Sequence, residues 1–380
     1  MAVKEMTHDE LERHIDKAYA TNISHLVLGA TGIGKSDTVK KKAIEISKRL
    51  GREFVLWNKL PKKEKYKVRD NPEKYFFLMD IRLAQLDPSD LRGLPALNGQ
   101  EIVEWKVPLW LHVASLEGAK GFIFFDEINL APQSIQGAAY QLIYDRELGE
   151  VPIQDGVLPI GAGNRLEDKA HVYDLPRPLQ NRFTHSTLSI PYINEACDES
   201  WGKWAMDNDI DMRVITFLIQ RPTLLNPKIK DDANERAFPT PRSWAYVSKL
   251  IKGETDLEWI ESLASSAVGA GAASEFASTL KFQRNIKLSD ILAHPEKAGD
   301  IKELDLKYSL ISLVADWYAQ NGKKDNLEKV LQICNVIQSE FAILLLRWTK
   351  AKHKSLFKTH VRSLKSWKPI SKKYQKYIIN

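Results

Sequence analysis

Cysteine is scarce in this sequence, and long apolar runs are missing. The two cysteines, Cys197 and Cys334, lie far apart and fit no metal-binding or redox spacing, so we expect packed thiols. The longest fully apolar runs, such as residues 341–346, are far too short to span a bilayer. The charged N-terminus has the spacing of an amphipathic helix and not the pattern of a signal peptide. These absences predict a cytoplasmic protein with no membrane partner.

Acidic residues are absent from the last part of the chain. Residues 341–380 contain 11 of the 55 Lys and Arg residues and no Asp or Glu. The other 340 residues carry 44 positive and 49 negative charges, so the net charge of +6 arises in this C-terminal tail. Aromatic residues are interleaved with the cations of the tail: Trp348, Phe357, Trp367, Tyr374 and Tyr377.

Two interpretations of the C-terminal tail stay open. Cations neutralise phosphates and aromatic rings stack on bases, so such a tail can bind nucleic acid. Alternatively, the tail is an amphipathic helix that packs through its aromatic residues and leaves a basic face in solvent. We favour the packed helix, because the basic run begins inside the core-like stretch at residues 341–346.

The sequence does contain one specific motif. Residues 29–36 read G-A-T-G-I-G-K-S and fit the phosphate-loop pattern G-x-x-x-x-G-K-[ST]. A short apolar strand at residues 25–28 precedes the motif, and residues 37–49 have helical spacing. We therefore predict a nucleotide site formed by eight consecutive residues: Gly29, Ala30, Thr31, Gly32, Ile33, Gly34, Lys35 and Ser36.

The chemistry of this loop explains its composition. Glycines allow a tight turn that aims several backbone N–H groups at one phosphate, and the helix N-terminus adds its positive end. In such a loop, the Lys35 ammonium reaches the β- and γ-phosphates of ATP, and the Ser36 hydroxyl binds Mg²⁺. The motif therefore predicts ATP and Mg²⁺ as ligands.

Polar side chains follow two of the predicted strands. Asp126 and Glu127 come directly after the apolar run at residues 121–125, and Asn164 follows a strand at residues 158–162. The carboxyl edge of an open α/β sheet is where ligands bind. Asp126 is predicted to hold Mg²⁺, directly or through water, and Glu127 to deprotonate the attacking water. Asn164 is predicted to hold that water or a γ-phosphate oxygen.

Alternating strands and helices predict an α/β fold with helices on both faces of a five-stranded parallel sheet. The strands are expected at residues 25–28, 75–81, 121–125, 158–162 and 186–190. Beyond Pro191 the chain is expected to be all helical. Two hairpins are expected, at residues 95–108 with a turn at Asn98-Gly99 and at residues 151–159 with a turn at Asp155-Gly156. A polar loop is expected to hold a small basic cluster: Lys59, Lys62, Lys63, Lys65, Lys67 and Arg69.

This order of motifs resembles the AAA+ ATPases, and within them the MoxR-like group of the helix-2-insert clade. The resemblance covers residues 26–244 and is carried by four segments: MDIRLAQLDPSDLRGLP at 79–95, FFDEINLAP at 124–132, GAGNR at 161–165 and FPTPRSW at 238–244. It implies a P-loop NTPase αβα core at residues 1–193, an α-helical lid at 194–270 and a C-terminal helical region with the basic tail at 271–380. The two hairpins lie where this group carries its helix-2 insert and the hairpin before sensor 1.

The resemblance also implies roles for single residues. Asn164 takes the sensor 1 position, and Arg182 takes the arginine-finger position, with Arg177 as an alternative. Arg242 takes the sensor 2 position at the start of a lid helix. Two structural alternatives stay open, because Arg182 can be a capping arginine and Arg242 can pair with a lid carboxylate. An arginine finger acts on the neighbouring subunit's site, so the resemblance implies a ring, most often a homo-hexamer.

For the biological role, the resemblance implies Mg-dependent ATP hydrolysis that drives chaperone-type remodelling of a partner. The partner in this group often carries a von Willebrand A domain. Trp105, in the first hairpin, is either a substrate contact or a buried residue that covers the sheet edge. The alternative function is an AAA+ motor or remodeller that acts on nucleic acid through the basic tail. A small-molecule P-loop kinase explains the phosphate loop alone, without the sensors and hairpins.

Overall fold

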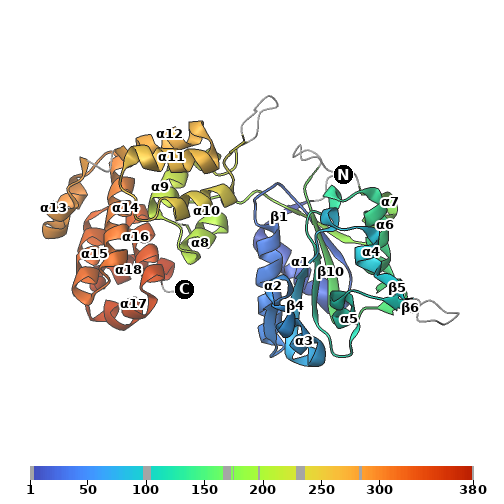
Figure 1. Cartoon of the computed structure of the whole chain (residues 1–380). Helices are drawn as coiled ribbons and strands as arrows, with labels where there is room; N and C mark the ends of the chain where they lie inside the picture. The colour runs from blue at the N-terminus through green and yellow to red at the C-terminus, as the bar shows by residue number, and fades with distance from the viewer. Residues whose placement is uncertain are drawn as a thin grey trace. The chain divides into compact units, whose positions relative to one another are not determined.

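The computed structural model describes residues 4–96, 104–165, 173, 175–195, 197–227, 236–281 and 285–378. The chain divides into two compact units, Met1–Ile190 and Pro191–Asn380 (Figure 1). The first unit contains all the described strands, and the described part of the second unit is helical throughout. The expected α/β fold class with an all-α remainder is therefore confirmed. The expected division of the second part into a lid and a C-terminal region stays a prediction.

The central sheet has seven parallel strands in the order β1-β11-β2-β10-β7-β4-β3. All five predicted strands are present, and two strands that the sequence did not predict, β1 and β3, form the two edges. β1 has only two residues, and β3 is followed by no motif of the kind that marks β2, which leads into the phosphate loop. The bounds are β1 (Glu5–Met6), β2 (His25–Leu28), β3 (Glu53–Leu56), β4 (Tyr75–Asp80), β7 (Gly121–Phe125), β10 (Val157–Gly163) and β11 (Thr184–Leu188).

Helices cover both faces of this sheet (Figure 1). On one face, α1 (His8–Thr21) and α2 (Lys35–Arg49) share an apolar core with the strands, in which Tyr19, Phe76 and Phe122 meet edge to face. On the other face, α5 (Leu109–Ser115) and α6 (Gln133–Tyr144) pack against a second core. Shorter helices complete the unit: η1 (Trp57–Lys59), α3 (Lys62–Asp70), η2 (Pro72–Lys74), η3 (Leu83–Gln85), α4 (Pro88–Arg92), η4 (Ile128–Leu130) and α7 (Arg177–Gln180).

The basic cluster and the first hairpin are both present, with differences from the expectation. The basic cluster at residues 59–69 was expected in a loop, but most of it lies in α3, because Val68 buries an apolar contact that orders the segment. The first hairpin is present as β5 (Leu94–Ala96) and β6 (Glu104–Lys106), which pair antiparallel, and its expected turn at Asn98-Gly99 lies outside the described residues.

The second hairpin lies earlier in the chain than predicted. Strands β8 (Glu147–Leu148) and β9 (Val151–Pro152) pair around Gly149, whose φ of +64° is readily adopted by glycine. The expected hairpin around Asp155-Gly156 is therefore wrong. Those two residues form the turn that leads into β10, where the Val157 N–H donates to the Gln154 carbonyl over 2.9 Å.

The second unit is a helical body with one continuous apolar core from Ile193 to Tyr374. Among the described residues, no helix is long and apolar enough to cross a membrane. The helices, in chain order, are α8 (Ser200–Asp207), α9 (Met212–Gln220), η6 (Pro222–Leu224), α10 (Pro241–Leu250), α11 (Leu257–Val268), α12 (Ala270–Lys281), α13 (Leu288–Ala293), η8 (Pro295–Asp300), α14 (Leu304–Gln320), α15 (Lys324–Val336), α16 (Ser339–Lys352), α17 (Lys354–His360), η9 (Val361–Ser363) and α18 (Trp367–Ile378).

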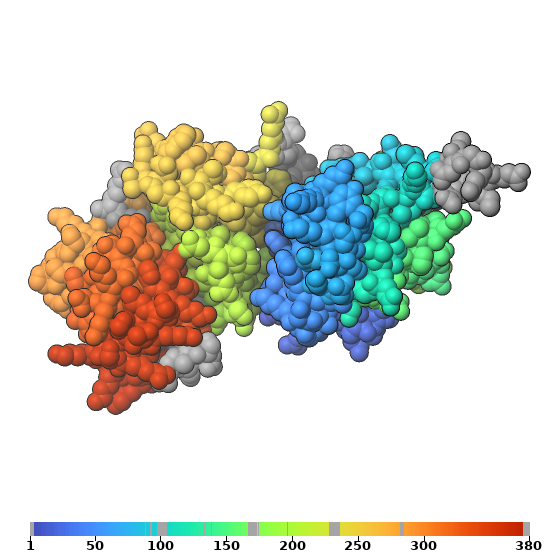
Figure 2. All heavy atoms as spheres, turned by 60° about the horizontal axis from the view of Figure 1, so that its bottom comes forward, coloured from blue at the N-terminus to red at the C-terminus, as the bar shows by residue number. Residues whose placement is uncertain are grey.

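The basic tail belongs to this core. Four of its five aromatic side chains are buried: Trp348, Phe357, Trp367 and Tyr374. The rings of Phe357 and Trp367 meet edge to face with centroids 6.0 Å apart. In Figure 2 the tail, in red, forms part of the surface of the second unit, where most of its cations are exposed. The packed amphipathic arrangement that we favoured is therefore present, in several short helices instead of one.

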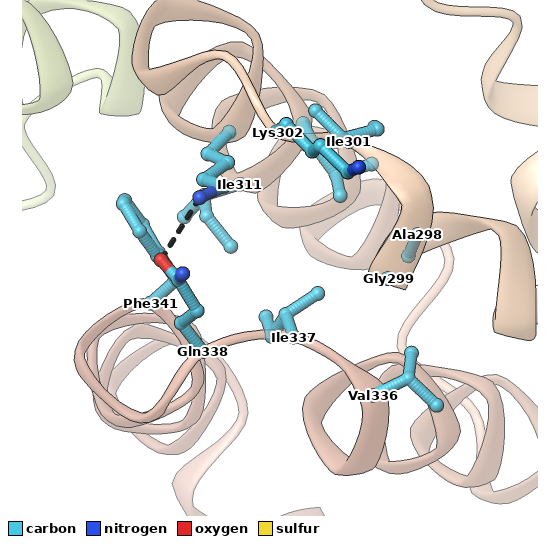
Figure 3. Close-up of a pocket in the computed structure, with 11 residues that line it drawn as sticks. Ala298, Gly299, Ile301, Lys302, Ile311, Val336, Ile337, Gln338 and Phe341 are labelled. Atoms are coloured by element: carbon cyan, nitrogen blue, oxygen red, sulfur yellow. Dashed lines mark hydrogen bonds between the residues drawn. The ribbon is translucent and has the colours of Figure 1, made fainter.

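A pocket of about 260 Å³ lies within the second unit, beside η8, α14 and the junction of α15 and α16 (Figure 3). Apolar side chains such as Ile301, Ile311 and Ile337 line it, and Lys307 donates to Oε1 of Gln338 over 2.9 Å at its edge. Ligand pockets for drug-sized molecules have volumes of roughly 300–1,000 Å³. On size alone, this pocket is not a candidate substrate site.

Candidate active site

The phosphate loop connects β2 to the N-terminus of α2. Gly32 and Gly34 have φ angles of +76° and +99°, a region that residues with a side chain rarely adopt. Gly34 is the N-cap of α2, and no side chain caps that end. The first N–H groups of the helix are therefore not bonded by a capping side chain, as an anion site requires.

Lys35, the first residue of α2, is buried and folds back over the loop. Its ammonium donates to the Gly29 carbonyl over 2.6 Å, to the Ala30 carbonyl over 2.8 Å and to Oδ1 of Asn164 over 3.0 Å. Thr31 also donates to Oδ1 of Asn164, over 3.4 Å. The structure thus brings the phosphate loop and the predicted sensor residue into direct contact.

Ser36 and Asp126 form the second contact between the loop and a strand end. The Ser36 hydroxyl donates to Oδ2 of Asp126 over 2.9 Å. Glu127 follows with a φ of +54°, in the left-handed region, and its side chain is exposed. Backbone strain of this kind costs roughly 1–3 kcal/mol and persists where the surroundings impose it, often at functional sites.

Magnesium ions prefer oxygen ligands, usually one or two carboxylates together with substrate phosphates and water. Asp126 and the Ser36 hydroxyl provide such oxygens, and they lie within hydrogen-bond distance of one another. Among the described residues there is no group of three or more His, Cys, Asp and Glu side chains that could hold a metal alone. The donor set therefore fits a Mg²⁺ ion that shares its coordination with a bound polyphosphate.

A third acid, Asp80, lies close to Asp126 and Glu127, the acid pair at the end of β7. It was not identified from the sequence. It ends β4, which is the neighbour of β7 in the sheet, at the register position opposite Phe124. Burial raises the pKa of Asp80, with Asp126 adding to the rise, Arg82 opposing it and Glu127 adding a smaller contribution. The signal was available, because an apolar strand ending in an acid occurs at both Asp80 and Asp126.

Asn129 was also missed, although its side chain bonds both backbone groups of Asn164. Its Nδ2 donates to the Asn164 carbonyl over 2.7 Å, and its Oδ1 accepts from the Asn164 N–H over 3.3 Å. Its own carbonyl accepts from the Tyr173 N–H over 2.7 Å. We call these two side-chain bonds to Asn164 the Asn129 clamp. Gly163 leaves space for the clamp, since a Cβ there would lie 2.7 Å from Oδ1 of Asn129.

The two arginine-finger candidates, Arg177 and Arg182, lie at the start of α7 and two residues beyond its end. Arg182 donates from Nε and Nη2 to the Tyr140 hydroxyl over 3.0 and 2.8 Å, and its guanidinium lies 3.3 Å from the ring centroid of Tyr144. The hydrogen bond that Arg182 donates to Tyr140 is the largest cause that raises the pKa of Arg182. Arg177 is the first residue of α7 and is exposed. Within its own unit, the described contacts of Arg182 are with α6 and not with the phosphate loop.

Arg242 lies in the second unit, as the second residue of α10, and is exposed. The helix begins with a capping box in which the Thr240 hydroxyl accepts from the Ser243 N–H over 3.0 Å. The residue is thus placed at a helix start, as expected, and its role stays a prediction.

Comparisons with known proteins give limited information. No family model matches the chain, and no curated protein matches it. Among solved structures, the chain is similar to NtrX from Brucella abortus in complex with ADP, at 13% identity and a TM-score of 0.36 over 99% of this chain and 70% of that one. It is also similar to the Thermotoga maritima RuvB Holliday junction branch migration motor, at 13% identity and a TM-score of 0.33 over 88% and 84% of the two chains. At such scores the likeness carries no argument, so the function is argued from this chain's own residues.

Proposed function

We propose that this protein is a Mg-dependent ATPase of the AAA+ class. The observation that carries the proposal is the pair of contacts that joins the phosphate loop to two different strand ends. Lys35 reaches Asn164 over 3.0 Å, and Ser36 reaches Asp126 over 2.9 Å. A glycine turn with no function has no reason to hold a buried ammonium, a hydroxyl, a carboxylate and an amide together. Nucleotide hydrolysis by phosphate-loop proteins uses each of these kinds of group.

The sheet order explains why these groups converge. Strand β10 lies between β2, which leads into the phosphate loop, and β7, which leads into the acid pair. All three strands are parallel, so their carboxyl ends lie at one edge of the sheet. A polyphosphate bound at the N-terminus of α2 would therefore have both Asp126 and Asn164 within reach.

The roles follow from charge. The Lys35 ammonium exchanges its loop carbonyl partners for phosphate oxygens and holds the β- and γ-phosphates. Ser36 and Asp126 hold Mg²⁺, which when bound neutralises charge on those phosphates. Glu127, exposed next to this pair, accepts the proton of the attacking water. Asn164 orients that water or a γ-phosphate oxygen through its side-chain amide.

We further propose that the protein works as a ring, most simply a hexamer, in which Arg182 completes the neighbour's site. Its guanidinium lies on Tyr140 and Tyr144, next to an exposed helix end, where a neighbouring subunit can be reached. Arg177 is the alternative finger, and Arg242 is proposed to contact the nucleotide as sensor 2. The proposed work of the ring is MoxR-like remodelling of a partner protein, including one with a von Willebrand A domain.

Trp105 supports a contact role for the first hairpin. It lies in β6 of a two-stranded sheet that is separate from the central sheet, and 47% of its surface is exposed. An exposed tryptophan on such a hairpin is suited to bind a protein partner, since aromatic residues are enriched in interface cores. The interpretation of Trp105 as a buried cover of the sheet edge is not supported.

The direct test is ATP hydrolysis by the full chain with and without Mg²⁺, compared with a Glu127→Gln variant. We expect the variant to bind ATP with unchanged affinity and to hydrolyse it ~10²–10⁴-fold more slowly, the usual contribution of a general base. A variant with wild-type turnover would remove Glu127 from this role. Because the ATP-bound variant is arrested, material retained with it identifies the substrate as protein or nucleic acid.

A nucleic-acid remodeller is the second candidate. It is favoured by the exposed cations of the tail: Lys354, Lys358, Arg362, Lys365, Lys368, Lys372 and Lys373. The buried tail aromatics are not available for stacking on bases, so binding would have to be electrostatic. Replacing four of these lysines by Glu should then abolish a salt-dependent affinity for DNA or RNA. If wild-type protein shows no such affinity at low salt, this candidate is wrong.

A further inference from the structure

Asn129 links three parts of the site that are far apart in the sequence. It belongs to η4, the turn that follows the acid pair Asp126 and Glu127. Its side chain bonds both backbone groups of Asn164, over 2.7 and 3.3 Å, and its carbonyl accepts from Tyr173 over 2.7 Å. Tyr173 begins the stretch of chain that leads to α7 and the arginine-finger candidates.

We propose that Asn129 is the positioning residue that sets the sensor Asn164 in register with the acid pair. This inference rests on the ATPase function proposed above. Asn164 contacts Lys35 through Oδ1 of its side chain, so the direction of that side chain depends on how its backbone is held. β10 ends at Gly163, which is the last residue of the strand in register with β2. The Asn129 amide bonds both backbone groups of the next residue, Asn164.

The surroundings of Asn129 make the clamp specific. Its side chain is 5% exposed, so both of its amide groups need partners, and Asn164 satisfies each of them. A side chain at position 163 would displace Oδ1 of Asn129, because an added Cβ would come within 2.7 Å of it. Asn129 thus joins the turn that follows the acid pair to Asn164 and to the backbone at Tyr173.

The chain contains a matched control. Asn58 forms the same two-bond clamp at the end of β4, donating to the Asp80 carbonyl over 2.7 Å and accepting from the Asp80 N–H over 2.9 Å. Asn58 is exposed and does not touch Asn164. The variant Asn58→Ala therefore removes an equivalent pair of bonds at Asp80, which is close to Asp126, and leaves the backbone bonds of Asn164 in place.

The test compares Asn129→Ala and the isosteric Asn129→Asp with Asn58→Ala in the full-length protein. Asp keeps the shape of the side chain but faces the Asn164 carbonyl with an acceptor instead of a donor. Residues that orient the ligands of a metal ion typically contribute about 10–100-fold to activity, and we expect the same range for a residue that orients the sensor. We expect kcat for ATP to fall about 10–100-fold in both Asn129 variants, with ATP affinity within about threefold of wild type.

Two further measurements separate positioning from general damage. The double variant Asn129→Ala/Asn164→Ala should hydrolyse ATP no more slowly than Asn164→Ala alone. If Asn129 acts only by positioning Asn164, the two substitutions remove the same contribution to catalysis. Exchange of the Asn164 amide hydrogen should accelerate in Asn129→Ala while the β7 amides stay protected. The proposal is overturned if both Asn129 variants keep kcat within threefold of wild type, or if Asn58→Ala accelerates amide exchange at Asn164 as much as Asn129→Ala does.

The same experiment distinguishes this inference from the function on which it rests. If the wild-type protein does not hydrolyse ATP, the proposed function is wrong, and amide exchange alone then decides the role of Asn129. Local acceleration at Asn164 supports the clamp, and unchanged exchange there contradicts it.

Discussion

The ammonium of Lys35 donates to Oδ1 of Asn164 over 3.0 Å. Lys35 follows strand β2 and Asn164 follows strand β10, so the two residues are far apart in the sequence. The same ammonium bonds two carbonyls of its own loop. Lys35 is thus held at the strand-end edge of the sheet by partners that a phosphate can replace. It connects the residues that bind a nucleotide to the residue that detects its terminal phosphate.

Replacing Lys35 by Ala should weaken ATP binding about 10–150-fold, because a hydrogen bond to a charged group contributes ~1.5–3 kcal/mol. Titration calorimetry with ATP and with ADP measures this directly. The loss should be larger for ATP than for ADP, since the γ-phosphate adds a partner for the ammonium. Equal losses for the two nucleotides would contradict the assigned reach of Lys35.

Replacing Arg182 by Ala should lower ATP turnover in the assembled protein by ~10³-fold or more, the usual contribution of an arginine finger. Tyr140→Phe is the control, because it removes the hydroxyl that Arg182 bonds while leaving the arginine in place. That control should change turnover far less.

Mixing experiments test whether the arginine acts between subunits. An Arg182→Ala chain keeps its nucleotide site, and a Lys35→Ala chain keeps its arginine. Rings assembled from both chains should regain part of the activity that neither chain has alone. A mixture as inactive as its components would show that Arg182 does not act on a neighbour's site.

The packing of the sheet predicts a large cost at Gly121. A Cβ at this position would lie 2.3 Å from the Phe77 carbonyl on the adjacent strand, so β4 and β7 would have to separate. Overpacking of this kind costs ~1–3 kcal/mol. Gly121→Ala should therefore lower the thermal unfolding midpoint. Gly137→Ala is the matched control, since nothing lies within 4 Å of an added Cβ there, and it should leave the midpoint unchanged or raised.

A half-buried carboxyl in the second unit predicts a pH dependence of stability. Burial, reinforced by Asp211 and opposed by Arg213, raises the pKa of Asp316 to about 7. Arg213 is engaged by Asp211, with Nη2 and Oδ2 2.7 Å apart. Between the unfolded and the folded pKa, the folded state binds more protons than the unfolded state, so stability falls as pH rises towards 7.

Asp316→Asn should remove this dependence. At pH 8 the variant should be more stable than wild type by on the order of a few kcal/mol, and at pH 5 the difference should be much smaller. Denaturant unfolding of both proteins between these two values measures the difference. Asp305→Asn, in the same helix, serves as the control, and a wild-type-minus-variant difference that does not change with pH would contradict the assignment.

Much of the first unit could be predicted from the sequence because its strands are buried on both faces. The runs at residues 75–80 and 121–125 are almost wholly apolar, and they occupy adjacent places in the sheet. The edge strands β1 and β3 could not be predicted in this way. They are short, and their pairing is determined by tertiary contact and not by local pattern.

Sequence motifs specify the chemistry of Lys35, Ser36 and Asp126, so these residues of the site could be predicted. Asn129 was not, although it stands within the segment FFDEINLAP. Its importance depends on the position of Asn164, which follows after 35 residues, and on the missing side chain of Gly163. Such a relationship becomes visible only when two strands and one turn are placed together.

The burial of Phe357, Trp367 and Tyr374 has a consequence for how the C-terminal region is handled. A deletion of the last thirty residues would remove one wall of the helical body, and any lost binding would then report unfolding. The positive charges, by contrast, lie on short helices of the same core. The electric field of this surface is therefore tied to the orientation of the helical body that carries the charges. Point substitution of single cations is the way to alter this field without changing the fold.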